Sequence, residues 1–130
     1  MGYESRTGAV LFARGLDQVA TFYSKVLGLV EVNRDEDHIL LESPGFQLVV
    51  HRIPGQPFTV MQSAEPSTRR ATAAFKPVFF VRSLESVRTI VSAHGGTMEP
   101  RAMEWSFKGV AVCDADDPEG NVIQFREMGS

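Results

Sequence analysis

The stretch "FARGLDQVATFYSKVLGL", residues 12–29, decides the fold of this chain. Leu16, Val19 and Tyr23 recur at helical spacing, which predicts an amphipathic helix with one apolar face. Gly28 comes directly after the last residues of this pattern, and glycine commonly ends helices because it adopts the left-handed conformation at little cost. The apolar run "AVLFA", residues 9–13, precedes the helix and predicts a strand. The stretch therefore predicts one strand followed by one helix.

The same pattern returns 68 residues later in "FVRSLESVRTIVSAHGGT", residues 80–97. At this offset Leu16 meets Leu84 and Gly28 meets Gly96. The run "PVFFV", residues 77–81, again predicts a strand ahead of the helix, and Ser83 is suited to cap the helix at its start. A repeat that occurs twice indicates a duplicated module rather than a long repeat array.

Three short strands are predicted after each helix, which gives the order βαβββ twice. In the first copy they span residues 29–34, 38–42 and 46–53, and in the second residues 97–104, 109–114 and 121–127. The predicted fold class is therefore α+β. We predict a single domain over residues 1–130, made of a module 5–53, a linker 54–73 and a module 74–128. The linker is long for a compact domain, which favours a flap or a partner contact.

The composition and charge of the chain argue against several classes of function. The net charge of −3 and the pI of about 5.6 give no basis for binding a nucleic-acid backbone. Cys113 is the single cysteine, which excludes an internal disulfide or a CxxC metal site, and its apolar neighbours favour an inert, partly buried thiol over a nucleophile. The sequence has no apolar leader and no run long enough for a membrane span. We predict a cytoplasmic protein with no membrane partner.

The two βαβββ copies, the helix "LDQVATFYSKVLGL" and the closing "DPEGNVIQF", residues 117–125, together resemble the vicinal oxygen chelate superfamily. That superfamily includes glyoxalase I, extradiol dioxygenases, fosfomycin-resistance transferases and bleomycin-resistance proteins. The resemblance covers residues 8–127. It implies two modules that form a cup-shaped, half-open mixed sheet with the helices on its convex side. Because this scaffold hosts both enzymes and plain binders, the resemblance does not fix a reaction.

The resemblance also implies four cup-facing positions, which hold a divalent metal in the metalloenzymes of the superfamily. Carried onto this chain, they are Gly8, Gln47, Lys76 and Gln124. Gly8 has no donor atom, and the ammonium group of Lys76 repels cations. We therefore predict no metal and no cofactor. A register shift that brings His51 or Glu42 into the cup would overturn this prediction.

Strand alternation then predicts which side chains line the cup. The lining combines aromatic walls with few polar groups, which is typical of a small-molecule pocket. The predicted ligand-binding residues are Phe12, Gln47, His51, Lys76, Phe80, Trp105, Gln124 and Arg126. Four of them have a second interpretation. Lys76 extends to solvent, Gln124 hydrogen-bonds a neighbouring strand, and His51 is an exposed residue near a strand end. Trp105, expected in a polar hairpin connection, either caps the cup or a partner surface or packs in the core.

The resulting hypothesis is a metal-free small-molecule-binding protein of the glyoxalase/bleomycin-resistance kind, which holds an organic ligand in the apolar cup. The resemblance implies a homodimer, because members of the superfamily often complete the cup across two chains. The alternative is a divalent-metal-dependent lyase or dioxygenase of the same superfamily. A third variant is metal-free catalysis with Lys76 or His51 as acid or base. Catalysis is left open, and no catalytic residue is predicted.

Overall fold

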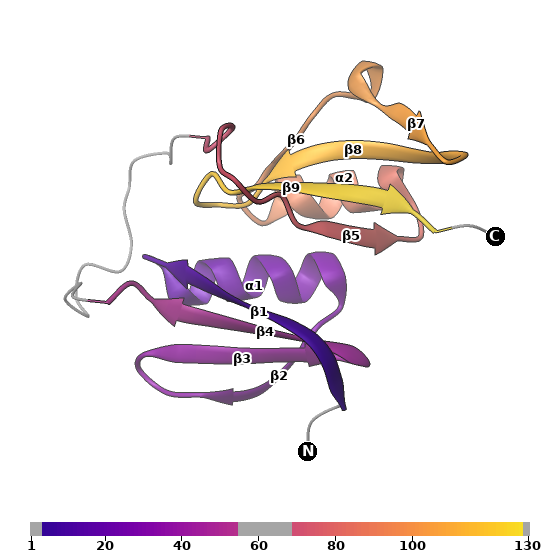
Figure 1. The fold of residues 1–130 in the computed structure, drawn as a ribbon. Coiled ribbons are helices and arrows are strands. Elements are labelled where there is room, and N and C mark those ends of the chain that lie inside the picture. Colours follow the sequence, from indigo (N-terminus) through magenta and orange to yellow (C-terminus); the bar gives the residue numbers. More distant parts are fainter. Residues whose placement is uncertain (1–3, 55–68, 129–130) are drawn as a thin grey trace. The chain divides into compact units, whose positions relative to one another are not determined.

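The computed structural model describes residues 4–54 and 69–128, so most of the predicted linker lies outside the described residues. The chain divides into two compact units, Met1–Pro66 and Ser67–Ser130. Each unit holds one open mixed sheet and one α-helix (Figure 1). The predicted α+β fold class with two modules is therefore confirmed.

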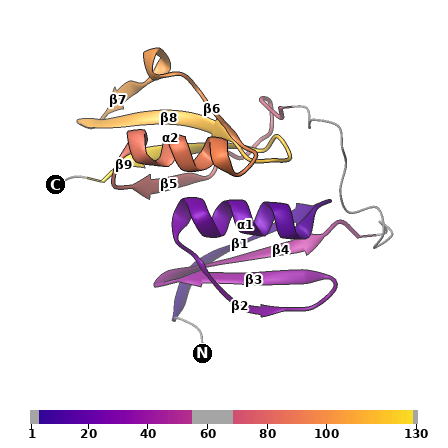
Figure 2. The same ribbon diagram turned by 180° about the vertical axis from the view of Figure 1, so that it is seen from behind.

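The first unit contains a four-stranded sheet with the strand order β1-β4-β3-β2. β1 pairs with β4 in parallel, and the other neighbours are antiparallel. Figure 2 shows α1 in front of the sheet, on one of its faces. The elements are β1 (Ser5–Ala13), α1 (Leu16–Leu27), β2 (Val30–Arg34), β3 (His38–Ser43) and β4 (Gly45–Arg52).

The core of the first unit lies between α1 and the sheet. Val19 and Phe22 of α1 are fully buried, as is Val50 of β4. The helix ends at Gly28, whose φ of 71° and ψ of 27° lie in the left-handed region, as the sequence predicted. None of the described helices has the length and apolar character that a membrane span requires.

The second unit repeats this topology. Its strand order is β5-β9-β8-β6, with β7 also paired to β8, and β5 runs parallel to β9. The Ser83 side chain accepts a hydrogen bond from the backbone N–H of Ser86 at 3.1 Å, so the predicted helix cap is present. The elements are β5 (Val78–Val81), α2 (Leu84–Ala93), β6 (Thr97–Met98), β7 (Trp105–Phe107), β8 (Val110–Asp116) and β9 (Val122–Glu127).

One predicted strand is interrupted. Instead of a continuous strand over residues 97–104, β6 ends at Met98 and a single 3₁₀ turn, Arg101–Met103, separates it from β7. Pro100 explains the break, because proline has no N–H to donate to a sheet ladder. Trp105 consequently lies in a strand rather than in the expected polar connection. The β7–β8 turn consists of Lys108 and Gly109, both with positive φ, which is the tight hairpin geometry.

In both units, the sheet face opposite the helix is open. On β1, Phe12 is 49% exposed whereas its neighbour Ala13 is buried. On β5, Phe80 is 59% exposed whereas Val81 is buried. This period-2 pattern agrees with the predicted alternation, and it leaves large apolar side chains on the two open faces.

Candidate functional site

A continuous row of polar side chains crosses the open face of the second sheet. Lys76 Nζ donates to Asp114 Oδ2 at 2.8 Å, and Gln124 Nε2 donates to Asp114 Oδ1 at 3.1 Å. Arg126 Nε in turn donates to Gln124 Oε1 at 2.8 Å. Gln124 is only 7% exposed, so its amide is held from both sides. We call Lys76, Asp114, Gln124 and Arg126 the polar row.

Sheet register explains why these four side chains meet. Gln124 pairs with Val78 on one side and with Asp114 on the other, and directly paired residues project to the same face. Arg126 shares that face because it lies two residues further along β9. The backbone N–H of Gln124 also donates to the carbonyl of Pro77 at 2.9 Å, which keeps β9 beside the residue that follows Lys76.

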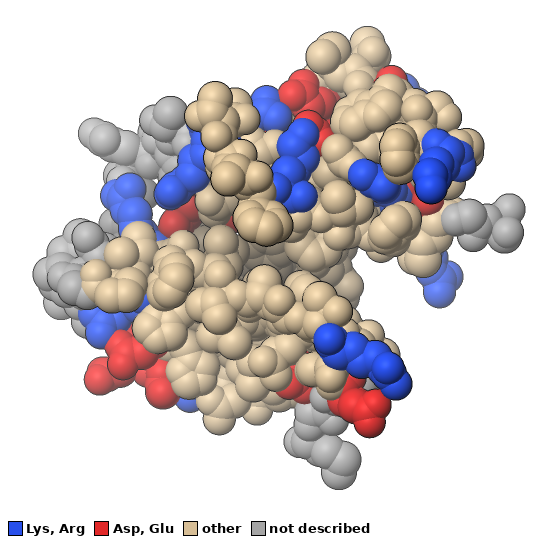
Figure 3. All heavy atoms as spheres, viewed as in Figure 1, with Lys and Arg blue, Asp and Glu red and all other residues tan. Residues whose placement is uncertain are grey.

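Aromatic side chains border the polar row. The guanidinium carbon of Arg126 lies 4.6 Å from the ring centre of Phe107, a cation–π distance. Arg126 pairs with Phe80 on β5 and with Val112 on β8, and Val112 pairs with Trp105. Figure 3 shows basic side chains scattered over a mostly uncharged surface on this side of the second unit. We call Phe80, Trp105 and Phe107 the aromatic border.

Five of the eight predicted ligand-binding residues thus lie in the polar row or the aromatic border, namely Lys76, Phe80, Trp105, Gln124 and Arg126. Sequence reasoning missed Asp114 and Phe107. A signal for each was present, because Asp114 is a charged residue two positions after Val112 within a strand, and Phe107 lies two positions after Trp105. Gln124 hydrogen-bonds Asp114 on the neighbouring strand, as its second interpretation expects, whereas the half-exposed side chain of Lys76 pairs with Asp114. Ligand contact stays a prediction for all of them.

The remaining predicted residues lie on the open face of the first sheet. The rings of Phe12 and His51 meet edge to face, with centres 5.7 Å apart. Gln47 Nε2 donates to Glu42 Oε2 at 2.8 Å, and Glu42 is only 5% exposed. His51 Nδ1 lies 2.6 Å from the carbonyl of its neighbour Arg52. This face therefore carries a ring pair and a separate amide–carboxylate pair.

The four positions carried over include Gln47 as the first-copy equivalent of Gln124, and the structure corrects this equivalence. In β1–β4 the partner of Val10 is Val49, and in β5–β9 the partner of Val78 is Gln124. Val10 and Val78 are 68 residues apart, so Val49 is the counterpart of Gln124. The parallel pairing of β4 with β1 sets this register, and the sequence offers no turn that would reveal it. A slip of two residues keeps the same sheet face, which is why the predicted alternation still holds.

The four positions implied by the resemblance do not fit a divalent metal. A Cβ added at Gly8 would lie 2.8 Å from the backbone oxygen of Gln47, so a ligating side chain there needs a backbone shift. The amide oxygen of Gln124 already accepts from a guanidinium, and an ammonium group bonds the adjacent carboxylate. A cation at this position would meet the positive charges of Lys76 and Arg126, and the two donors there, the Gln124 amide oxygen and the Asp114 carboxylate, already accept from other groups.

The alternative donors do not converge either. Glu42 pairs with Gln47, whereas His51 pairs with Phe12, four residues further along β4. Four strand residues span roughly 13 Å. Among the described residues, no group of three or more His, Cys, Asp or Glu side chains could hold a metal ion.

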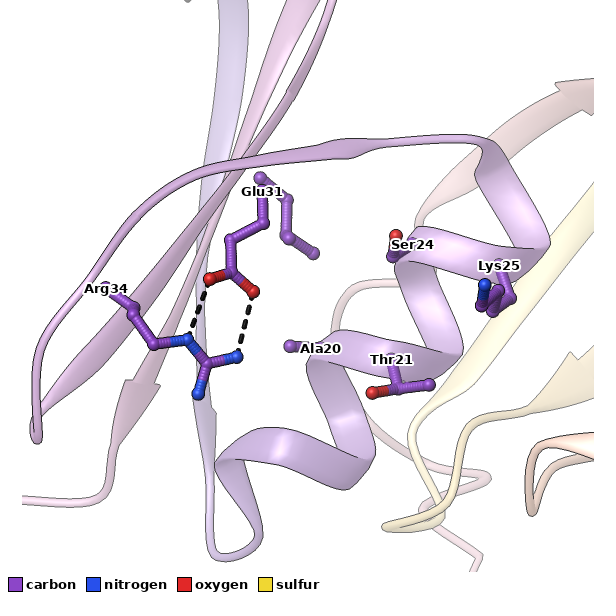
Figure 4. A pocket seen from close by; sticks show the side chains of 7 residues that line it. Ala20, Thr21, Ser24, Lys25, Glu31 and Arg34 are labelled. Atoms are coloured by element: carbon purple, nitrogen blue, oxygen red, sulfur yellow. Dashed lines mark hydrogen bonds and ion pairs between the residues drawn. The ribbon is translucent and has the colours of Figure 1, made fainter.

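A small hollow lies between α1 and β2, away from the predicted lining (Figure 4). Arg34 forms a two-point pair with Glu31 there, and this hydrogen bonding lowers the pKa of the Glu31 carboxyl. Its volume of about 90 Å³ is far below the roughly 300 Å³ of small ligand sites. We therefore do not assign an organic ligand to it. Its lining consists of Ala20, Thr21, Ser24, Lys25, Glu31, Arg34 and Leu41.

Cys113 lies on the helix-facing side of β8 and is fully buried. Burial raises the pKa of its thiol, and its Sγ lies 3.4 Å from the carbonyl of Glu99. A raised pKa leaves less thiolate at neutral pH, so this thiol is not activated as a nucleophile. The predicted inert thiol agrees with this environment.

Comparison with known proteins identifies the fold. No family model matches the sequence, and no curated protein matches it. A glyoxalase/bleomycin resistance protein/dioxygenase family enzyme from Burkholderia phytofirmans PsJN is similar in structure, with a TM-score of 0.71 at 18% identity over 95% of this chain and 98% of the other. A glyoxalase/bleomycin resistance protein from Albidiferax ferrireducens T118 gives 0.64 at 19% identity over 95% and 98%.

A lactoylglutathione lyase from Agrobacterium tumefaciens is similar as well, with a TM-score of 0.59 at 16% identity over 93% of this chain and 91% of the other. The chain thus has the fold of the glyoxalase/bleomycin-resistance/dioxygenase proteins, which is the fold of the vicinal oxygen chelate superfamily. At these identities the likeness concerns the fold, and the function has to be argued from the site.

Proposed function

We propose that this chain is a small-molecule-binding protein that holds an organic ligand against the open faces of its sheets without a metal. The observation that carries the proposal is the polar row beside the aromatic border. Few polar groups fixed by hydrogen bonds, surrounded by exposed aromatic side chains, are typical of sites that bind small organic molecules. Phe80, 59% exposed, offers a large apolar surface that a ligand would cover.

The proposal includes a homodimer in the cytoplasm. Val10 and Phe12 of β1 are 57% and 49% exposed, and a second copy or a bound ligand would remove this apolar surface from water. The single cysteine fits a reducing compartment, where proteins do not rely on disulfides.

Metal content of the purified protein tests the proposal first. The protein is prepared without chelator or affinity nickel, then soaked in Zn, Ni, Mn or Fe(II) and desalted. We expect clearly less than one metal per chain in every sample, because the Gly8 and Lys76 positions supply no donor. Thermal-shift screening of aromatic compounds should then find ligands. At a concentration of about 100 times its Kd, such a ligand should raise the melting temperature by several degrees.

About one bound metal per chain would contradict the metal-free proposal and favour the lyase or dioxygenase alternative. The variants Glu42→Gln and His51→Ala then identify the ligands, since each removes one donor from the first sheet. Glu36→Gln, a change at an exposed carboxylate outside both open faces, is the matched control. A library without any stabilising compound would contradict ligand binding itself.

A further inference from the structure

The open face of the second sheet also points to the chemical class of the ligand. Resting on the proposed function, we infer that the site takes an aromatic monocarboxylate, whose carboxylate pairs with Arg126 and whose ring lies against the aromatic border.

Arg126 is oriented before any ligand arrives. Its Nε donates to Gln124 Oε1 at 2.8 Å, and Phe107 lies against its guanidinium at 4.6 Å. In the described part of the chain, its two terminal nitrogens have no hydrogen-bond partner. A guanidinium held at Nε presents these two N–H groups as a fork, which matches the two oxygens of a carboxylate.

The charges of the polar row favour one negative charge on the ligand. Lys76 is neutralised by Asp114, whose Oδ2 lies 2.8 Å from its Nζ. Gln124, the hydrogen-bond partner of Arg126, is neutral, and within the described residues Arg126 forms no ion pair. The row therefore carries one positive charge without a carboxylate partner, which a monoanion balances and a cationic ligand opposes.

The surface beside Arg126 suits a flat ring. Val112, its partner on β8, is fully buried on this face, and Trp105 lies on the next strand with 43% exposure. Adjacent strands are about 4.8 Å apart, so Trp105 and Arg126 are separated across the sheet by roughly 10 Å. One or two fused or linked aromatic rings span that distance and contact Trp105 while the carboxylate reaches Arg126.

Three compounds with one ring system and different charges test the inference. Biphenyl-4-carboxylate, biphenyl-4-carboxamide and 4-phenylbenzylamine are titrated into the full chain by calorimetry. In NMR spectra of the same titrations, the indole N–H signal of Trp105 reports contact with the site, because Trp105 is the single tryptophan of the chain. We expect the carboxylate to bind about tenfold or more tightly than the amide, the amine to bind weakest, and the indole signal to shift on binding.

Variants of Arg126 separate charge from geometry. Arg126→Met should lower the affinity for the carboxylate by about tenfold or more and leave the affinity for the amide nearly unchanged. Arg126→Lys keeps the positive charge but loses the two-pronged guanidinium. Its affinity for the carboxylate should therefore lie between those of the wild type and Arg126→Met. Arg82→Met is the matched control, since Arg82 is exposed at the end of β5 and outside the polar row. Urea midpoints show that each variant is folded.

The failures are distinguishable. If the amide or the amine binds as tightly as the carboxylate, or if Arg126→Met loses no more affinity than Arg82→Met, the inference is wrong while ligand binding stands. If none of the three binds and wider screening also finds no ligand, the proposed function falls together with the inference.

Discussion

At the scale of single residues, Cys113 gives a direct test of local burial. We expect iodoacetamide to label it in the native protein at pH 8 more than about 100-fold more slowly than in urea, because labelling requires local opening. Burial raises the pKa of the folded thiol above that of the unfolded one, so the native thiolate fraction is the smaller at this pH. The native labelling rate should therefore keep rising as the pH passes the ordinary thiol pKa of about 8.5.

The control for Cys113 is the same chain unfolded in urea, where the thiol has its ordinary pKa. Equal labelling rates in the native and unfolded samples would show that the thiol is accessible. A native rate that levels off near neutral pH would show an activated thiolate instead, and the assignment as an inert core residue would then be wrong.

Residue positions were predictable where they depend on alternation alone. The period-2 pattern placed Gln124 and Arg126 on one face of their strand, and the structure has them hydrogen-bonded to each other. Asp114 was not predicted as the partner of Gln124, because that contact depends on which strand is the next neighbour and in which register. Hydrophobic pattern fixes the face of a strand, whereas long-range pairing fixes its contacts.

At the scale of elements, the cap of α2 is a specific prediction. Ser83→Ala should lower the free energy of unfolding by about 1 kcal/mol, because the side chain accepts a hydrogen bond from the backbone N–H of Ser86 that is otherwise left without an acceptor. Urea unfolding followed by far-UV circular dichroism measures this difference. We expect a lower urea concentration at the midpoint of unfolding and an unchanged dependence of the unfolding free energy on urea concentration.

Ser92→Ala is the matched control within the same helix. Ser92 is exposed near the end of α2, and alanine is the better helix former, so this change should be neutral or slightly stabilising. An equal loss of stability in both variants, or no loss in Ser83→Ala, would contradict the capping role.

Helices and strands were easier to predict when they were long and when residues that start or stop them marked their ends. Both α-helices were predicted from apolar spacing, with Ser83 and Gly28 marking a start and an end. The prediction of one continuous strand over residues 97–104 was wrong, because Pro100 interrupts it after β6. The next strand, β7, pairs with β8 in a hairpin. Short strands depend on their partners, so their limits follow tertiary pairing more than local sequence.

At the scale of the whole molecule, the duplication is visible in both sequence and topology. β1 pairs in parallel with β4, as β5 does with β9, and one helix follows the first strand in each unit. The likeness to solved structures at 16–19% identity fits this simple rule, because the fold needs an apolar pattern and turns at the right places rather than particular side chains. Function depends on those particular side chains, so the site had to come from the structure.

The last prediction concerns salt, where two opposing charge effects act on an anionic ligand. The net charge of −3 repels it from roughly 15 Å, which amounts to less than about 1 kcal/mol in water, and most of this is already screened at about 0.1 M salt. A fork at Arg126 acts at about 4 Å, inside the Debye length of about 10 Å, and is worth about 1–4 kcal/mol. The local attraction therefore dominates above about 0.1 M.

We thus expect the affinity for biphenyl-4-carboxylate to fall several-fold between about 0.1 M and about 1 M sodium chloride, where the Debye length shrinks to about 3 Å. The uncharged amide is the control, and its affinity should hold or rise slightly, because it depends on apolar contact. Calorimetry at the two salt concentrations measures both. If the carboxylate follows the amide, its ring alone is recognised and Arg126 does not pair with it.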